Sequence, residues 1–156
     1  MSDTWYFAYG SNLSKGRIQK RTGLIRCAKR ALLRDYRLVF NKRASKGNVY
    51  ANIQKAEGVT VWGVIYLCNA EAMAKLDHYE GVKGGHYERQ PVEVQLEDGS
   101  RQAAIAYVAC VEQIVSEGMP SAEYLGHILT GAAEHLLPDD YIQMVRRLGE
   151  ETVTDL

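Results

Sequence analysis

The sequence has little cysteine and no long apolar run, and each shortage excludes a class of protein. Its 156 residues include three cysteines with no C-x-x-C pair, which argues against a disulfide framework and is typical of a reducing compartment. No stretch approaches the ~18 apolar residues that a spanning helix needs, and the first residues lack the basic and apolar regions of a signal peptide. We therefore expect a cytoplasmic protein without a membrane partner.

An excess of charge of either sign is also missing. Lys plus Arg and Asp plus Glu each number 19, so the formal net charge is zero, and we expect no nucleic-acid partner. The basic stretch 15–43 is interpreted as a solvated face. The four histidines show no zinc-site spacing, Ser11 does not lie in G-x-S-x-G, and Gly10 to Gly16 is not followed by Lys-Ser or Lys-Thr, so we expect neither metal nor cofactor.

The order of the predicted elements indicates an α+β fold in one domain, 1–156. Strand-like segments come first and two helices come last, which favours a mostly antiparallel, closed sheet over alternating βαβ units. Strands are predicted at 5–9, 24–33, 35–41, 49–54, 59–68, 87–96 and 101–110, with a polar loop at 42–48 and a hairpin turn at 97–100. Helices are predicted at 14–21, at 70–78, from 120 onward, and from 138 to a stop at Gly149.

The turn Tyr9-Gly10-Ser11-Asn12 is the first candidate site. A strand leads into a glycine turn and a short helix follows, so successive backbone N–H groups are placed to bind a carboxylate or an oxyanion. Gly10 has no Cβ to obstruct a ligand. The alternative is an ordinary turn in which Ser11 or Asn12 caps the helix.

Glu80 is the second candidate, in a segment that reads LDHYEGV. It follows the predicted helix 70–78, where the helix dipole disfavours an anion, and apolar neighbours flank it. Both features raise the pKa of a carboxyl group above its usual ~4.3 and suit it to proton transfer. A solvent-facing glutamate at a helix end is the alternative.

Tyrosine is the third signal, because ten tyrosines stand against two phenylalanines and two tryptophans. Those at positions 6, 9, 87, 107 and 124 fall on or beside the predicted sheet and the helix after Pro120. Their hydroxyl groups would suit a pocket for a small zwitterion. Alternatively, they are half-buried aromatic residues of the sheet with their hydroxyl groups at the surface.

Four motifs in order resemble the γ-glutamylcyclotransferase family. They are the Y-G-S-N turn, the central-sheet segments YANI at 50–53 and VWGVIY at 61–66, the stretch EGVKGGHY at 80–87, and PSAEY at 120–124. The resemblance extends from Tyr6 to Leu148. At position 12, the glutathione-specific and the γ-glutamylamine relatives carry Leu. Asn12 therefore makes the chain more similar to plain cyclotransferases and to deprotection enzymes of the butirosin-pathway type.

The resemblance implies a small mixed β-barrel, mostly antiparallel, with helices around it. It implies Glu80 as the general acid/base, a substrate site formed by Tyr6, Tyr9, Gly10, Ser11, Asn12, Tyr87, Tyr107 and Tyr124, and a homodimer. The implied reaction converts a γ-glutamyl amide or peptide to 5-oxoproline plus a free amine or amino acid. The alternatives are the same chemistry on a γ-glutamylated natural product or polyamine, and a non-catalytic metabolite-binding module on this fold.

Overall fold

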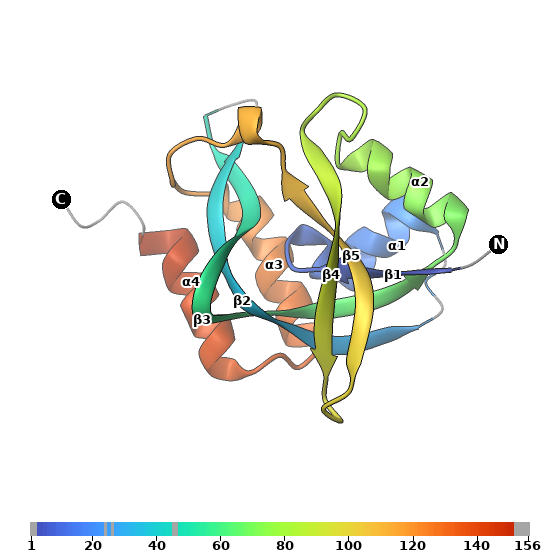
Figure 1. Cartoon of the computed structure of the whole chain (residues 1–156). Coiled ribbons are helices and arrows are strands. Elements are labelled where there is room, and N and C mark those ends of the chain that lie inside the picture. The colour runs from blue at the N-terminus through green and yellow to red at the C-terminus, as the bar shows by residue number, and fades with distance from the viewer. Residues whose placement is uncertain (1–2, 24, 26, 45–46, 152–156) are drawn as a thin grey trace.

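A computed structural model describes residues 3–23, 25, 27–44 and 47–151. The chain runs through five strands, four α-helices and two short 3-10 turns in these regions (Figure 1). The strands are β1 (Thr4–Ala8), β2 (Ala28–Arg43), β3 (Val49–Cys68), β4 (Tyr87–Leu96) and β5 (Arg101–Ala109). The helices are α1 (Lys15–Thr22), α2 (Ala70–Tyr79), α3 (Ala122–Glu134) and α4 (Asp139–Glu151), and the 3-10 turns are η1 (Ser11–Leu13) and η2 (Val111–Gln113).

The five strands close into a barrel in the order β1-β3-β2-β4-β5. All neighbouring pairs are antiparallel except β1 and β5, which meet in parallel where Tyr6 lies opposite Ile105. This single parallel contact makes the barrel mixed and closes it by joining its two outer strands. The expected α+β fold with a mostly antiparallel closed barrel is confirmed.

At two places, the structure has one long strand where the sequence predicts two consecutive short ones. The predicted breaks between them were wrong. Segments 24–33 and 35–41 belong to β2 from Ala28 onward, while residues 24 and 26 lie outside the described residues. Segments 49–54 and 59–68 both belong to β3. The β2–β3 register shifts after Arg34. There, Asp35 adopts φ 66° and its carboxylate accepts a hydrogen bond from the Gly58 N–H at 3.0 Å. This bulge breaks the apolar alternation, but the strands continue past it.

The helix starts follow local capping signals. The side chains of Ser14, Asn69 and Ser121 accept hydrogen bonds from backbone N–H groups in the first turns of α1, α2 and α3, as expected for N-caps. Gly149, the predicted end of the last helix, instead lies inside α4. A Cβ there would come within 2.7 Å of Leu125 on α3, so this glycine permits close helix packing and does not terminate the helix.

Helix α3 supports the turn that follows β1. Gly131 packs so tightly against this turn that an added Cβ would lie 2.2 Å from the Leu13 carbonyl carbon. In Figure 1, α1 and α2 lie together on one side of the barrel and α4 lies on the other. Within the described part of the chain, no helix is long and apolar enough to span a membrane.

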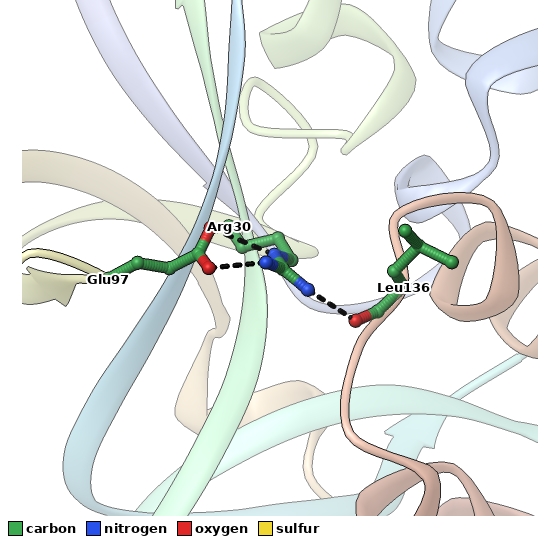
Figure 2. A network of polar contacts seen from close by, with 3 residues as sticks. All are labelled: Arg30, Glu97 and Leu136. Atoms are coloured by element: carbon green, nitrogen blue, oxygen red, sulfur yellow. Dashed lines mark hydrogen bonds and ion pairs between the residues drawn. The ribbon is translucent and has the colours of Figure 1, made fainter.

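A polar network links the barrel to the connection between α3 and α4 (Figure 2). The Arg30 guanidinium on β2 binds both carboxylate oxygens of Glu97, in the β4–β5 turn, and donates to the Leu136 carbonyl at 2.7 Å. Leu136 has a left-handed φ of 57°, and the next N–H, of Leu137, returns to the Ala132 carbonyl at 3.0 Å. This geometry ends α3 and directs the chain into α4.

Candidate active site

One cavity of about 390 Å³ lies between the turn after β1, helix α1, the end of α2, and the facing ends of β2 and β3. Its volume is in the range of small-molecule sites. All nine candidate residues from the sequence line it: Tyr6, Tyr9, Gly10, Ser11, Asn12, Glu80, Tyr87, Tyr107 and Tyr124. The structure thus brings together motifs that are up to 118 positions apart in the sequence.

The Y-G-S-N turn is held by contacts from three elements. The Asn12 side-chain amide donates to the Tyr6 hydroxyl at 3.0 Å and accepts from the Arg21 guanidinium at 3.2 Å. The Tyr66 hydroxyl, on β3, lies 3.2 Å from both the Asn12 and the Leu13 carbonyl oxygens. Because the buried Asn12 side chain is occupied by these internal bonds, it fixes the shape of the turn.

The backbone of this turn offers free hydrogen-bond donors. The N–H groups of Leu13 and Ser14 bond to the carbonyls of Gly10 and Ser11. Among the described residues, no partner is found for the N–H groups of Ser11 and Asn12, which are the first donors of η1 and are left unpaired by helical geometry. Free donors of this kind suit an anionic oxygen, and the anion site expected at this turn stays a prediction.

Glu80 is placed by the way in which helix α2 ends. The Glu80 N–H makes the last helical bond to the Leu76 carbonyl, at 2.8 Å, and the Val82 N–H returns to the Asp77 carbonyl at 3.0 Å. Gly81 has φ 65° between them, the left-handed position that glycine adopts without strain. The E-G-V sequence is thus a helix-termination signal that directs the Glu80 side chain into the cavity.

The Glu80 carboxyl group is an uncommon acid. Burial raises its pKa from 4.5 to about 7, against the opposing effect of Arg21, Arg17 and Lys42. The residue is partly exposed only because it faces the open cavity, and none of the described side chains hydrogen-bonds to its carboxylate. The expected direction is confirmed, but burial, which outweighs three cations, is the largest cause.

A second acid, one turn earlier on α2, anchors this helix to the barrel. The Asp77 carboxylate accepts two hydrogen bonds from Arg89 on β4, both at 2.8 Å, and one from the Tyr107 hydroxyl on β5 at 2.6 Å. These contacts fix the end of α2 against two strands. They thereby fix the position of Glu80, which follows Asp77 by three residues.

Three of the seven tyrosines that line the cavity donate their hydroxyl hydrogen bonds to the protein itself. Tyr9 donates to the Tyr107 carbonyl at 2.6 Å and Tyr87 to the Ala51 carbonyl at 2.7 Å, while Tyr107 bonds to Asp77. The hydroxyl oxygens of Tyr6 and Tyr124 accept hydrogen bonds from Asn12 and from the Ala51 N–H. Their own O–H protons have no acceptor within the described regions, so these two hydroxyl groups are available to a ligand.

Sequence reasoning missed the cations of the cavity. Four of them line it: Arg17, Arg21, Lys42 and Arg43. The interpretation of the stretch 15–43 as a solvated face was therefore wrong for the first three, while Arg43 is exposed. The available signal was the spacing of Arg17 and Arg21 by four residues directly after the turn, which places both on one helix face. Lys42 gives no local signal, because its environment is made by residues distant in sequence. The described residues contain no group of three His, Cys, Asp or Glu side chains that could hold a metal ion.

The fold and the site together define the class of the protein. It is a small β-barrel protein whose cavity holds one acid with a raised pKa among several cations, beside a turn with free backbone donors.

Comparisons with known proteins narrow this class. Residues 60–145 match the AIG2-like family. Human γ-glutamylcyclotransferase is 32% identical over 155 residues, covering 96% of this chain and 80% of the human protein. A solved structure titled γ-glutamyl cyclotransferase superposes with a TM-score of 0.82 at 30% identity, covering 93% of this chain and 87% of that one. The putative γ-glutamylcyclotransferase YkqA of Bacillus subtilis is 30% identical over 93% of this chain, which spans about half (52%) of its length. The chain therefore belongs to the γ-glutamylcyclotransferase family of enzymes.

Proposed function

We propose that this protein is a γ-glutamyl cyclotransferase that releases 5-oxoproline from a γ-glutamyl amide or peptide. The α-amine of the γ-glutamyl group attacks its own γ-carbonyl, the amide C–N bond breaks, and the leaving amine or amino acid departs. The observation that carries the proposal is the Glu80 carboxyl group, whose pKa lies near 7, in a cavity shared with the Y-G-S-N turn.

The reaction needs no protein nucleophile, because the attacking and attacked groups belong to one molecule. It needs proton transfer. The attacking nitrogen goes from three N–H bonds to one, and the leaving nitrogen gains the two protons. Glu80 carries each proton in turn, first as base and then as acid. A pKa of about 7 in place of 4.5 makes transfer from an ammonium group easier by roughly 3 kcal/mol.

The anionic parts of the substrate have matching donors in the cavity. In this proposal the free N–H groups of Ser11 and Asn12 and the hydroxyl groups of Tyr6 and Tyr124, all at the cavity, bind the α-carboxylate or the oxyanion that forms at the γ-carbon. A well-placed donor to such an oxyanion contributes about 3–4 kcal/mol to transition-state stabilisation. Tyr9, Gly10, Tyr87 and Tyr107 complete the proposed substrate site as its walls.

The test is release of 5-oxoproline by the wild type and by Glu80→Gln. We expect the wild type to release it from γ-glutamyl-alanine, and Glu80→Gln to lose at least ~10³-fold in kcat, while it still binds 5-oxoproline. Glu71→Gln is the control, because Glu71 lies exposed on the same helix. Substantial turnover by Glu80→Gln would show that another group moves the proton. Binding of 5-oxoproline without turnover of any γ-glutamyl compound by the wild type would identify a binding module.

A further inference from the structure

Lys42 is a buried cation that the Glu80 carboxyl group influences from across the cavity without touching it. The residue is 3% exposed and lines the cavity from the end of β2. Its ammonium group donates to the Arg43 carbonyl at 2.7 Å and to Nδ1 of His86 at 2.9 Å. Nζ also lies 5.7 Å from the centre of the Tyr50 ring and 5.5 Å from that of the Tyr87 ring. In the described part of the chain, no carboxylate lies within 4.0 Å of it.

This environment is incomplete for an ammonium group. An ammonium has three N–H donors, and the described contacts with protein acceptors account for two of them. A cation withdrawn from water is destabilised unless an anion approaches it. The carbonyl, the imidazole and the two aromatic rings are all neutral when His86 accepts the hydrogen bond, and Glu80 acts on Lys42 only from a distance. An anion that enters the cavity and touches the ammonium group would complete the site.

The cations of the cavity fall into two groups, one at the Y-G-S-N turn and one at the end of β2, where the exposed Arg43 follows Lys42. Arg17 and Arg21 extend from α1 and bond to Ser11 and Asn12, at 3.0 Å and 3.2 Å. They belong to the Y-G-S-N end, where the proposed function puts the α-carboxylate or the oxyanion of the γ-glutamyl group. Lys42 comes from β2 and is bound to His86, which follows α2. Lys42 makes no described contact with the Y-G-S-N turn, so its ammonium group is free to meet another part of the same ligand.

We propose that Lys42 determines specificity for the leaving group by binding a carboxylate on the amine that is released. The chain then favours γ-glutamyl compounds whose leaving amine carries a carboxylate, and it disfavours neutral amines and polyamines. This inference rests on the proposed function, because the position of the leaving group is defined only if Glu80 acts on a γ-glutamyl amide.

The test compares γ-glutamyl-alanine with γ-glutamyl-alaninamide, which differ only in whether the leaving amine carries a carboxylate or a carboxamide. Because the amide also changes the basicity of the leaving amine, the informative quantity is the ratio of the two kcat/KM values in each protein. We expect Lys42→Met to lower this ratio by about 10- to 100-fold, the contribution of a hydrogen bond to a charged group. The loss should fall on γ-glutamyl-alanine and appear mainly in KM.

Controls separate this effect from a general loss of structure. Lys75→Met removes an exposed lysine of α2 and should leave the ratio unchanged. Affinity for 5-oxoproline should be the same in Lys42→Met as in the wild type, because that product lacks the leaving group. Lys42→Gln, which removes the charge but keeps an N–H donor for the Arg43 carbonyl, is the second variant if methionine at this position prevents folding.

Two negative results have different meanings. In the first, the wild type turns over both compounds while the Lys42 variants keep the wild-type ratio of the two kcat/KM values. Lys42 then does not bind the carboxylate of the leaving group, and this inference is overturned while the proposed function stands. If the wild type releases no 5-oxoproline from any γ-glutamyl compound, the proposed function fails and the inference falls with it.

Discussion

Two acids one turn apart on helix α2 occupy opposite electrostatic environments. Glu80 faces the cavity, and burial raises its pKa to about 7. Burial also acts to raise the pKa of Asp77, but hydrogen bonds from Arg89 and Tyr107 outweigh it and hold that pKa below its usual value. Both acids have cations nearby. Only Asp77 has them in direct contact, at 2.8 Å.

The difference shows how one helix end provides both a reactive acid and an anchor. An acid that already accepts three hydrogen bonds holds its charge and cannot exchange protons near neutral pH. An acid kept close to cations but out of contact with them can titrate there and transfer a proton. The anchoring of Asp77 fixes the helix end from which Glu80 projects, so the two acids have complementary roles.

The largest expected effect in this comparison concerns stability at alkaline pH. Because the folded-state pKa of Glu80 lies above its unfolded value of 4.5, the folded state binds more protons between these two values, and stability falls as pH rises from about 4.5 to 7. Glu80→Gln removes this ionisation. We expect it to raise the free energy of unfolding by up to about 3 kcal/mol at pH 8 and by little at pH 4.5.

Urea unfolding of the wild type and of Glu80→Gln at both pH values measures this effect. A variant that loses turnover while gaining stability would show that the acid is kept for function at the expense of folding. Equal free energies of unfolding for the two proteins at pH 8 would mean that the Glu80 carboxylate is well solvated. Glu80 and Asp77 would then not differ in electrostatic environment as described.

A smaller effect is expected for Asp77→Asn. The Arg89 pair is about one-third exposed, so its loss together with a weaker Tyr107 bond should lower the free energy of unfolding by about 1–2 kcal/mol at pH 7. The stabilisation exists above the unfolded pKa of 3.8 and is lost as pH falls through the lowered folded pKa. The variant and the wild type should therefore converge at low pH.

Thermal unfolding as a function of pH, together with kcat, checks this prediction. We expect kcat to fall by no more than about tenfold, because Asp77 positions Glu80 and touches no reacting atom. Glu57→Gln, an exposed acid on β3, is the control and should leave both quantities unchanged. A loss of kcat as large as that of Glu80→Gln would assign Asp77 to the chemistry itself.

The predictable features were those written in local sequence. The helix over 70–78, the helix start after Pro120, the hairpin at 97–100 and the E-G-V helix end depend on a few neighbouring residues. The motifs therefore marked nine residues that the structure places around one cavity. Their roles in binding and proton transfer remain proposals, to be decided by the experiments above.

The features that could not be predicted from the sequence depend on contacts between distant segments. The continuity of β2 and β3 follows from a bulge at Asp35 and Gly58 that no periodic pattern announces. The role of Gly149 depends on Leu125 of another helix. The sequence places Lys42 in the predicted polar loop 42–48. Its contacts with His86 and Tyr87 form only when the barrel closes.

The proposed acid/base role of Glu80 depends on the pH at which its carboxyl group loses its proton. Carboxyl carbon-13 NMR measures that pH directly. Titration of the free enzyme, with resonances assigned through Glu80→Gln and Asp77→Asn, reports both acids in one spectrum. The predicted result is a midpoint near pH 7 for Glu80 and one below 3.8 for Asp77. A Glu80 midpoint near 4.5, the value of an ordinary glutamate, would contradict the proposed role.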